Sequence, residues 1–274
     1  MTRLADLAGT RELAINLTLR ELRGKYKRSF LGWGWSLLNP VLSTAVYWVV
    51  FSAFLRIKPP VGNPSGLHLF VVFLLCGLLP WTYFSNSVDT SLEVLVSNGN
   101  LIKKVYFPRQ ILVAASINAL LATFLIELGV LAVVLLVVGN MVLPWIPVLL
   151  LIVAVQTIFL LGLGLLLSVL NVFFRDVKHL TKVALQVLFY SAPIVYPLRL
   201  VPVRGHILGW DVPLRRLYSL NPLVRMMNCY RAVLYDLRFP PLWDFAYFAL
   251  WAFGALALGW WVFSRLEGRV AEEV

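Results

Sequence analysis

The chain has 274 residues, of which 60% are hydrophobic and only 14% are charged. This composition leaves too few polar side chains to cover a soluble domain, so it excludes a soluble globular enzyme and predicts a protein that crosses a membrane several times. The net charge of +11 could suggest nucleic-acid binding, but the 24 Lys and Arg residues follow the ends of the apolar runs instead.

A basic segment, residues 1–34, precedes the first apolar run. Glu12, Asn16 and Arg20 recur every four residues and so share one face of a helix, while leucines occupy its other faces. The pattern predicts an amphipathic helix on the cytoplasmic membrane surface. Its basic residues would either attract lipid phosphates or simply fix the orientation of the chain. The residues concerned are Arg20, Arg23, Lys25, Lys27 and Arg28.

Residues 35–274 contain six long apolar runs. Each supplies the roughly 20 residues that a helix needs to cross a hydrocarbon core of about 30 Å. Helices satisfy their own backbone polar groups, and these runs lack the alternating polarity of barrel strands, so an all-α membrane domain with six spans is predicted. The runs cover residues 36–57, 67–96, 110–139, 144–170, 180–198 and 242–263.

The Lys and Arg residues are divided unequally between the two sides of these spans. Fifteen lie on the side that holds both termini and nine on the other, which places both termini in the cytoplasm. The exception is residues 199–241, whose seven arginines would lie outside. Because this segment is long, Pro-rich and apolar, we expect it to fold back onto the bundle. Asn221 and Pro222 have the N-cap and first-turn chemistry of a helix that runs to Tyr235.

Few ionisable residues fall inside the predicted spans. Asp89 and Glu93 lie four residues apart near the cytoplasmic end of the second span, where we expect them to face water. Glu127 lies near the middle of the third span, where burying a charged carboxyl group costs free energy. Its side chain would therefore either be protonated and hydrogen-bonded to a neighbouring helix, or carry protons across the membrane. A proton-driven carrier that uses Glu127 is therefore one alternative function.

The chemistry of a soluble active site is missing from the sequence. His68, His179 and His206 are scattered and have no partners at metal-ligand spacing, so no metal site is predicted. No phosphate-binding GxxxxGK[ST] motif occurs either. If nucleotide drives transport, ATP and magnesium must be bound by another chain, and no cofactor is expected in this one. A membrane-embedded enzyme, a further alternative, would need an acid-base or metal cluster that the sequence does not supply.

Two connections on the cytoplasmic side combine basic and aromatic residues. Residues 97–110 break the second span at Asn98–Asn100 and then form a short basic-aromatic helix, after which the chain restarts at Pro108 into the third span. Residues 171–180 place Arg175 and Asp176 side by side. A short helix held between two long spans is a stiff lever, so either connection could transmit a force to both spans; the simpler interpretation is a pair of basic loops.

Aromatic residues also recur near mid-membrane depth in the first, second and fifth spans. Interface anchoring does not explain this depth. Aromatic rings there would either pack between helices or line a pore, where they could stack on the apolar faces of sugars. These residues are Tyr47, Phe51, Trp81, Phe84, Phe189 and Tyr190.

Six ordered segments give the chain a recognisable likeness. They are SFLGWGWSLLNP (29–40), GLLPWTYFSNSVDTS (77–91), NGNLIKKVYFPRQIL (98–112), NVFFRDVKHL (171–180), SAPIVYP (191–197) and LNPLVRMMNCYRAVL (220–234). In this order they resemble the permease subunits of bacterial ABC polysaccharide exporters, which move O-antigen, teichoic acid or capsular chains across the cytoplasmic membrane. The resemblance spans nearly the whole chain.

The resemblance implies a homodimer of six-span subunits joined to two copies of a separate ATPase. It implies a coupling helix at residues 98–107. We expect the force from the ATPase to reach the turn of Arg175 and Asp176 as well. It also implies an extracellular gate formed by re-entrant helices at 201–235. The coupling helix includes Asn100, Leu101, Ile102, Lys103, Lys104, Val105, Tyr106 and Phe107, and the gate includes Asn221, Pro222, Arg225, Tyr230 and Arg231.

A transport mechanism connects these elements. The basic amino-terminal residues would attract the phosphates of a lipid-linked glycan, closure of the ATPase would push the coupling helix, and the sugar chain would slide past the aromatic rings. No covalent step is required of this chain. An ABC exporter of drugs or small lipids is the alternative nearest to this hypothesis.

Overall fold

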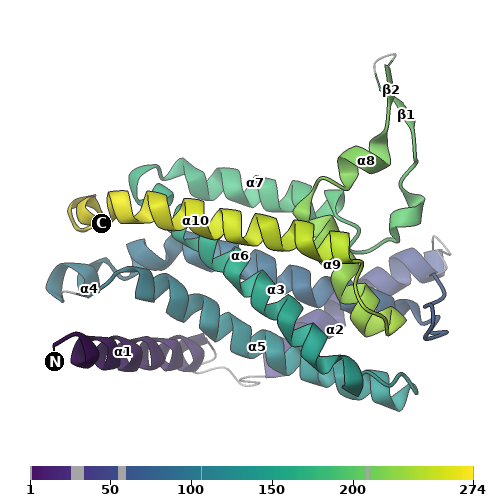
Figure 1. Ribbon diagram of the computed structural model, residues 1–274, viewed down its shortest axis with the longest axis horizontal. Coiled ribbons are helices and arrows are strands. Elements are labelled where there is room, and N and C mark those ends of the chain that lie inside the picture. The colour runs from purple at the N-terminus through teal and green to yellow at the C-terminus, as the bar shows by residue number, and fades with distance from the viewer. Residues whose placement is uncertain (1, 26–33, 55–59, 106, 208–209, 274) are drawn as a thin grey trace.

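A computed structural model describes residues 2–25, 34–54, 60–105, 107–207 and 210–273. These residues form a bundle of helices that extend along the long axis of the molecule, with a small two-stranded hairpin projecting at one end (Figure 1). Both chain ends lie at the opposite end of the bundle, beside the short helix α4 (Figure 1).

Most of the described chain is helical. Segments η1 and η4 are π-helical, and η2 and η3 are short 3₁₀ turns. In chain order the elements are α1 (Thr2–Lys25), α2 (Gly34–Trp48), η1 (Val49–Phe54), α3 (Phe70–Ser97), α4 (Gly99–Lys104), α5 (Gln110–Val137), η2 (Leu143–Trp145), α6 (Ile146–Phe173), α7 (Asp176–Ser191), η3 (Leu198–Leu200), β1 (Gly205–Ile207), β2 (Trp210–Val212), α8 (Leu214–Tyr218), α9 (Pro222–Arg231), η4 (Ala232–Asp236) and α10 (Leu242–Glu273).

Within the described ranges, four helical segments are long and apolar enough to cross a membrane. They are α3, α5, η2 with α6, and α10 up to Val270. They correspond to the second, third, fourth and sixth predicted spans, so these four predictions are confirmed as long apolar helices. Apolar side chains from all four enter one continuous core, as expected of a multi-pass membrane protein.

The first and fifth predicted spans are shorter helices. At the first, the 15-residue α2 continues directly into the six-residue η1, and its apolar stretch is Pro40–Phe51. At the fifth, α7 begins at Asp176 and ends at Ser191, seven residues before the predicted end. Pro193 explains the early end, because a proline disfavours helical backbone in the residue before it, and Ala192 is indeed extended.

Close backbone contact holds α6 against α10, its most extensive helix neighbour. A Cβ atom on Gly259 would lie 2.0 Å from the carbonyl oxygen of Gly162, and one on Gly162 would lie 2.3 Å from the backbone of Ala255. Only glycine fits at either position. Such small-residue crossings let membrane helices gain dispersion energy where lipid provides no hydrophobic driving force between them.

Buried amides link the same helices. Asn171 on α6 donates to the carbonyl of Leu92 on α3 at 2.7 Å, and Gln156 donates to the carbonyl of Pro80 at 2.9 Å. Both side chains are almost completely buried. A polar side chain at this depth is costly unless it is hydrogen-bonded, so these contacts define how α3 and α6 are aligned.

The segment expected to contain only helices, residues 201–235, includes the β-hairpin. β1 and β2 pair antiparallel, with Gly205 opposite Val212 and Ile207 opposite Trp210. A short helix, α8, follows the hairpin, and the helix predicted from Pro222 is present as α9. The all-helical prediction therefore needs this one correction, because strands of three residues are too short to give a periodic signal.

Candidate functional site

The six predicted mid-depth aromatic residues form one connected cluster, although they come from four separate elements. Phe189 on α7 is its centre, with ring centroids 5.9 Å from Tyr47 and 5.5 Å from Trp81. Phe51 extends the cluster from Tyr47 at 6.4 Å, Phe84 extends it from Trp81 at 5.5 Å, and Tyr190 contacts Phe189 at 5.2 Å.

The cluster runs from the core to the surface. Phe84 is 3% exposed and stacks on Phe159, which reaches Phe248 on α10. Tyr47, Phe51 and Phe189 are half-buried, and Tyr190 is 66% exposed. The six side chains thus form a wall that continues into the core on one side and is open on the other.

Two ion pairs join α7 to α3 beyond this wall. Lys178 pairs with Glu93, and Nζ of Lys182 lies 4.0 Å from Oδ1 of Asp89. Both carboxylates are about half exposed, which fits the prediction that they face water. Their basic partners were missed in the sequence, although the signal was there: each pair of like charges is spaced four residues apart, so two antiparallel helices can bring both pairs into register.

The predicted coupling helix corresponds to α4. It follows α3 directly and contacts α10, and it lies at the end of the bundle that holds both termini (Figure 1). Ile102 is buried and Leu101 half-buried, whereas Asn100, Lys103, Lys104 and Val105 are exposed. Phe107 is half-buried, and Tyr106 lies outside the described residues. The helix therefore has one anchored face and one basic face open to a partner.

Hydrogen bonds at Asn98, where α4 begins, and at Arg109, where α5 begins, link these two points to other parts of the chain. Arg20 on α1 donates to Oδ1 of Asn98 at 2.7 Å, and the Asn98 amide donates to the carbonyl of Val94 at 2.8 Å. The backbone N–H of Arg109 donates to Glu267 on α10 at 3.1 Å. A displacement of α4 would therefore act on α1, α3 and α10.

Arg175 and Asp176 mark the start of α7 and are both exposed. Asp176 lies in the first turn, where a negative charge is favourable to the helix dipole. Arg175 lines a cavity of about 330 Å³ with Asn171, Lys178 and His179, among others. Because Lys178 also pairs with Glu93, this cavity at the start of α7 borders the contact between α3 and α7.

The basic amino-terminal residues are only partly described. Arg20 is 48% exposed and is bound to Glu21 as well as to Asn98, and Arg23 is exposed. Lys25 is the last residue of α1, and nothing is described of its side chain. Lys27 and Arg28 lie outside the described residues. α1 packs beside α5 and follows the long axis of the bundle (Figure 1), whereas the sequence predicted a helix flat on the membrane surface.

At the other end of the molecule, the predicted gate residues begin α9 as expected. Asn221 caps the helix by accepting a hydrogen bond from the N–H of Leu223 at 3.0 Å, and Pro222 occupies the first turn. Arg225 forms an ion pair with Asp244 on α10 and donates to the carbonyl of Ser219 at 2.9 Å. These contacts fix α9 against the start of α10.

Tyr230 and Arg231 extend from α9 into the core. The Tyr230 hydroxyl donates to Gln156 at 2.6 Å. Arg231 donates to the carbonyl of Ile194 at 2.7 Å, and its guanidinium lies 3.8 Å from the ring centre of Phe73. Burial lowers the pKa of Arg231 to about 10, so it remains charged at neutral pH. The sequence predicted Tyr230 and Arg231 but not Gln156, since one amide in an apolar run has no distinguishing spacing.

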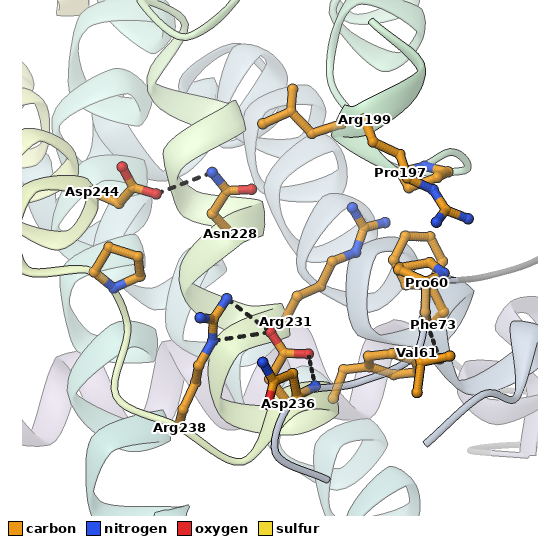
Figure 2. Close-up of a pocket in the computed structure, with 14 residues that line it drawn as sticks. Pro60, Val61, Phe73, Pro197, Arg199, Asn228, Arg231, Asp236, Arg238 and Asp244 are labelled. Carbon is orange, nitrogen blue, oxygen red and sulfur yellow. Dashed lines mark hydrogen bonds and ion pairs between the residues drawn. The ribbon is translucent and has the colours of Figure 1, made fainter. Parts of the chain in front are cut away.

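A cavity of about 390 Å³ opens beside Arg231 (Figure 2). Arg199, Arg238, Asp236 and Asp244 also line it, so its walls carry both signs of charge. Arg238 binds Asp236 at 3.1 Å, and Asn228 donates to Asp244 at 3.0 Å. The carboxylates here are already paired with side chains of the same wall.

Comparisons with known proteins find a family and several relatives with a similar sequence. Residues 12–235 match the sequence profile of the family described as ABC-2 type transporter. The chain is 30% identical over 265 residues to the O-antigen export system permease protein RfbA of Klebsiella pneumoniae, covering 95% of this chain and 94% of that one. It is 33% identical over 236 residues to RfbA of Myxococcus xanthus, covering 86% and 85%. It is 26% identical over 229 residues to the polysialic acid transport protein KpsM of Escherichia coli, covering 78% of each.

Proposed function

Because the chain belongs to the ABC-2 type transporter family, whose members are the membrane-embedded permeases of ABC transporters, we propose that it exports a lipid-linked polysaccharide across the cytoplasmic membrane of a bacterium. The cargo would be O-antigen-like, teichoic acid or capsular. The chain is a transport subunit and not an enzyme, and ATP is hydrolysed by a separate ATPase partner.

The observation that carries the proposal is the aromatic wall on α2, η1, α3 and α7. One chain supplies a wall with an open side, and a second copy related by two-fold symmetry would close it into a lined pathway. Aromatic faces suit the apolar faces of sugar rings, and many weak stacking contacts allow a long chain to slide. We propose a homodimer with the pathway between the two copies, bound to two ATPase subunits.

A polar side chain of α7 supports this pathway. Gln186 is exposed on the same helix as Tyr190. If α7 spans the membrane next to lipid alone, the Gln186 amide would face hydrocarbon, which is unfavourable. Facing a water-filled route between two copies, it would be hydrated. Under this proposal α2 with η1, and α7, are the first and fifth of six spans, and both termini lie in the cytoplasm.

The basic face of α4 would then receive the force from the ATPase. Lys103 and Lys104 are exposed, while the buried Ile102 and the hydrogen bonds of Asn98 attach the helix to the bundle. Movement of the ATPase would be passed through α4 to α3 and α10, and at the Arg175–Asp176 turn to α7. Arg20, Arg23 and the basic residues that follow would attract the anchor phosphates of the cargo on the same side.

Reconstitution tests this function. The chain is purified with its co-encoded ATPase, placed in liposomes, and supplied with ATP and a lipid-linked glycan. We expect the glycan to stimulate ATP hydrolysis and to become accessible on the far side of the membrane. Transport that persists without the ATPase or without ATP, and stops in Glu127→Gln, would instead establish a proton-driven carrier.

A further inference from the structure

Four arginines converge on a second cavity at the end of the molecule opposite α4. This cavity has a volume of about 530 Å³ and lies between η3, the segment that leads into β1, α8 and the start of α9. Among the described residues that line it, none is acidic. We call it the arginine pocket. Its lining is Leu198, Val203, Arg204, Pro213, Arg215, Arg216, Ser219 and Arg225.

Two of the arginines are held in place by the protein itself. Arg215 donates to the carbonyls of Val201, at 2.9 Å, and Arg199, at 3.3 Å. Arg225 donates to the carbonyl of Ser219 and pairs with Asp244, which lines the neighbouring cavity of Figure 2. Carbonyl acceptors fix a guanidinium without neutralising it, so the charge of Arg215 remains available.

The other two arginines, Arg204 and Arg216, are exposed at the pocket. In the part of the chain that the structure describes, neither has an ion pair with a carboxylate. Like charges in one concavity repel each other unless an anion lies between them. Guanidinium groups match phosphate oxygens in geometry, and each carries several N–H donors that can bind at the same time.

The position of the pocket favours a phosphate group at a membrane surface. The Tyr247 hydroxyl on α10 donates to the carbonyl of Leu220 at 2.8 Å, next to Ser219 of the pocket. One turn earlier, Trp243 is 69% exposed at the start of α10, as is common for tryptophans at the level of lipid headgroups. In the orientation proposed above, the arginine pocket would therefore lie at the level of the headgroups of the outer leaflet.

We propose that the arginine pocket binds a phosphate or diphosphate ester group on the outer face of the membrane. This inference rests on the proposed function for its orientation, since α4 must face the cytoplasm. It also accounts for four of the seven arginines of residues 199–241, which are otherwise anomalous on the outside of a membrane protein. The group could be carried by a lipid headgroup or arrive as a free anion, and the two sources can be separated.

The test measures equilibrium binding to the full chain in complex with its ATPase, in nanodiscs of neutral lipid and without ATP. One arm titrates a polyprenyl diphosphate incorporated into the nanodisc, and the other titrates inorganic pyrophosphate in solution. Each arm compares the wild type with the double variant Arg204→Ala/Arg216→Ala, its conservative form Arg204→Lys/Arg216→Lys, and Arg238→Ala. The last variant removes a positive charge at the same end of the molecule but outside the arginine pocket.

We expect the alanine double variant to bind about tenfold more weakly or worse, the lysine double variant to retain most of the affinity, and Arg238→Ala to bind like the wild type. A loss in the lipid arm identifies a headgroup, and a loss in the pyrophosphate arm alone identifies a free anion. Equal affinity of the wild type and the alanine double variant in both arms overturns the proposal, as does an equal loss in Arg238→Ala.

Because Arg204 and Arg216 are exposed, the variants should fold, which gel filtration and basal ATP hydrolysis check. Glycan export by the wild-type complex is measured separately. If export fails while the binding difference is present, the proposed function is wrong but the anion site stands. If export succeeds without a binding difference, only the anion site is wrong.

Discussion

The Tyr230 hydroxyl donates a 2.6 Å hydrogen bond to Oε1 of Gln156, and the amide of the same Gln156 donates at 2.9 Å to the carbonyl of Pro80. One buried amide thus joins α9, near the end of the molecule that we propose to be external, to two of the long helices. Tyr230 and Gln156 are both fully buried, so water cannot replace either contact. Any movement of α9 as a gate must break this link or carry α3 and α6 with it.

Removing the Tyr230 hydroxyl should therefore destabilise the protein. We expect Tyr230→Phe to lower the free energy of unfolding by about 1–3 kcal/mol, because the oxygen of Gln156 would be left buried without its donor. The measurement is thermal unfolding of the purified chain in detergent. Tyr247→Phe is the matched control, since its hydrogen bond to Leu220 is exposed. If the two variants lose equal stability, the buried link has no special role.

The contact between α6 and α10 leads to a second stability prediction. Gly162→Ala or Gly259→Ala should force the two helices apart, because the added carbon would lie 2.0–2.3 Å from backbone atoms that cannot rotate away. We expect reduced yield of folded protein and a lower unfolding temperature. Gly254→Ala, on the same helix α10, is the control, as nothing lies within 4 Å of its added carbon. Normal folding of both crossing variants would contradict the close packing.

The aromatic wall predicts different effects at its two ends. Trp81→Ala would lower export but would also remove a buried ring, at a stability cost of about 3–5 kcal/mol, so its effect on export would be hard to interpret. Tyr190→Ala is cleaner because Tyr190 is 66% exposed. We expect it to fold normally and to slow glycan export about twofold to tenfold, which is the loss of one stacking contact. Tyr47→Ala should also lower export and leave insertion intact.

The control for the wall is Phe253→Ala on α10, which removes a ring outside the cluster that is 56% exposed, compared with 66% for Tyr190. Export is measured in liposomes and insertion by membrane fractionation. Full export in Tyr190→Ala and Tyr47→Ala together would refute the aromatic pathway.

The sequence was sufficient for the long helices and the α9 cap, because each depends on a local signal. Long apolar runs predict helices, and Asn221 before Pro222 predicts a helix start. The sequence predicted a common depth for the six aromatic residues, but their contacts with one another depend on which helices are adjacent. The end of α7 was wrong because apolar character continues past Ser191 while Pro193 stops the helix. The Lys178–Glu93 pair was missed although the four-residue spacing on both helices was a signal for it. The Gln156 contacts could not be predicted, since they depend on which helices are adjacent. The role of the wall in transport stays a prediction.

The ion pairs between α7 and α3 allow a test of whether these two helices move against each other during transport. If α7 shifts against α3 during transport, Lys178–Glu93 and Lys182–Asp89 must break and form again. We expect Glu93→Lys to impair export, because it would place a second positive charge next to Lys178. We expect the swapped variant Glu93→Lys/Lys178→Glu to recover export, because it restores an ion pair at this position. Export by the three proteins is compared at low and high salt, since exposed pairs are screened. Equal export by all three would mean that the pairs play no part in the cycle.

The final prediction concerns coupling. Lys103 and Lys104 are exposed on α4, whereas Ile102 on the same helix is buried, so charge reversal should leave the anchored face intact. We expect Lys103→Glu/Lys104→Glu to insert and fold normally but to separate ATP hydrolysis from glycan export, because its basic face would no longer match the ATPase. The matched control is Arg269→Glu, an exposed charge reversal in the last turns of α10, at the same end of the molecule. Both rates are measured in the same liposomes, and their ratio is the deciding quantity. A normal ratio in the double variant would remove α4 as the coupling element, and an equal change in Arg269→Glu would show that charge at this end, and not α4 itself, governs the partner.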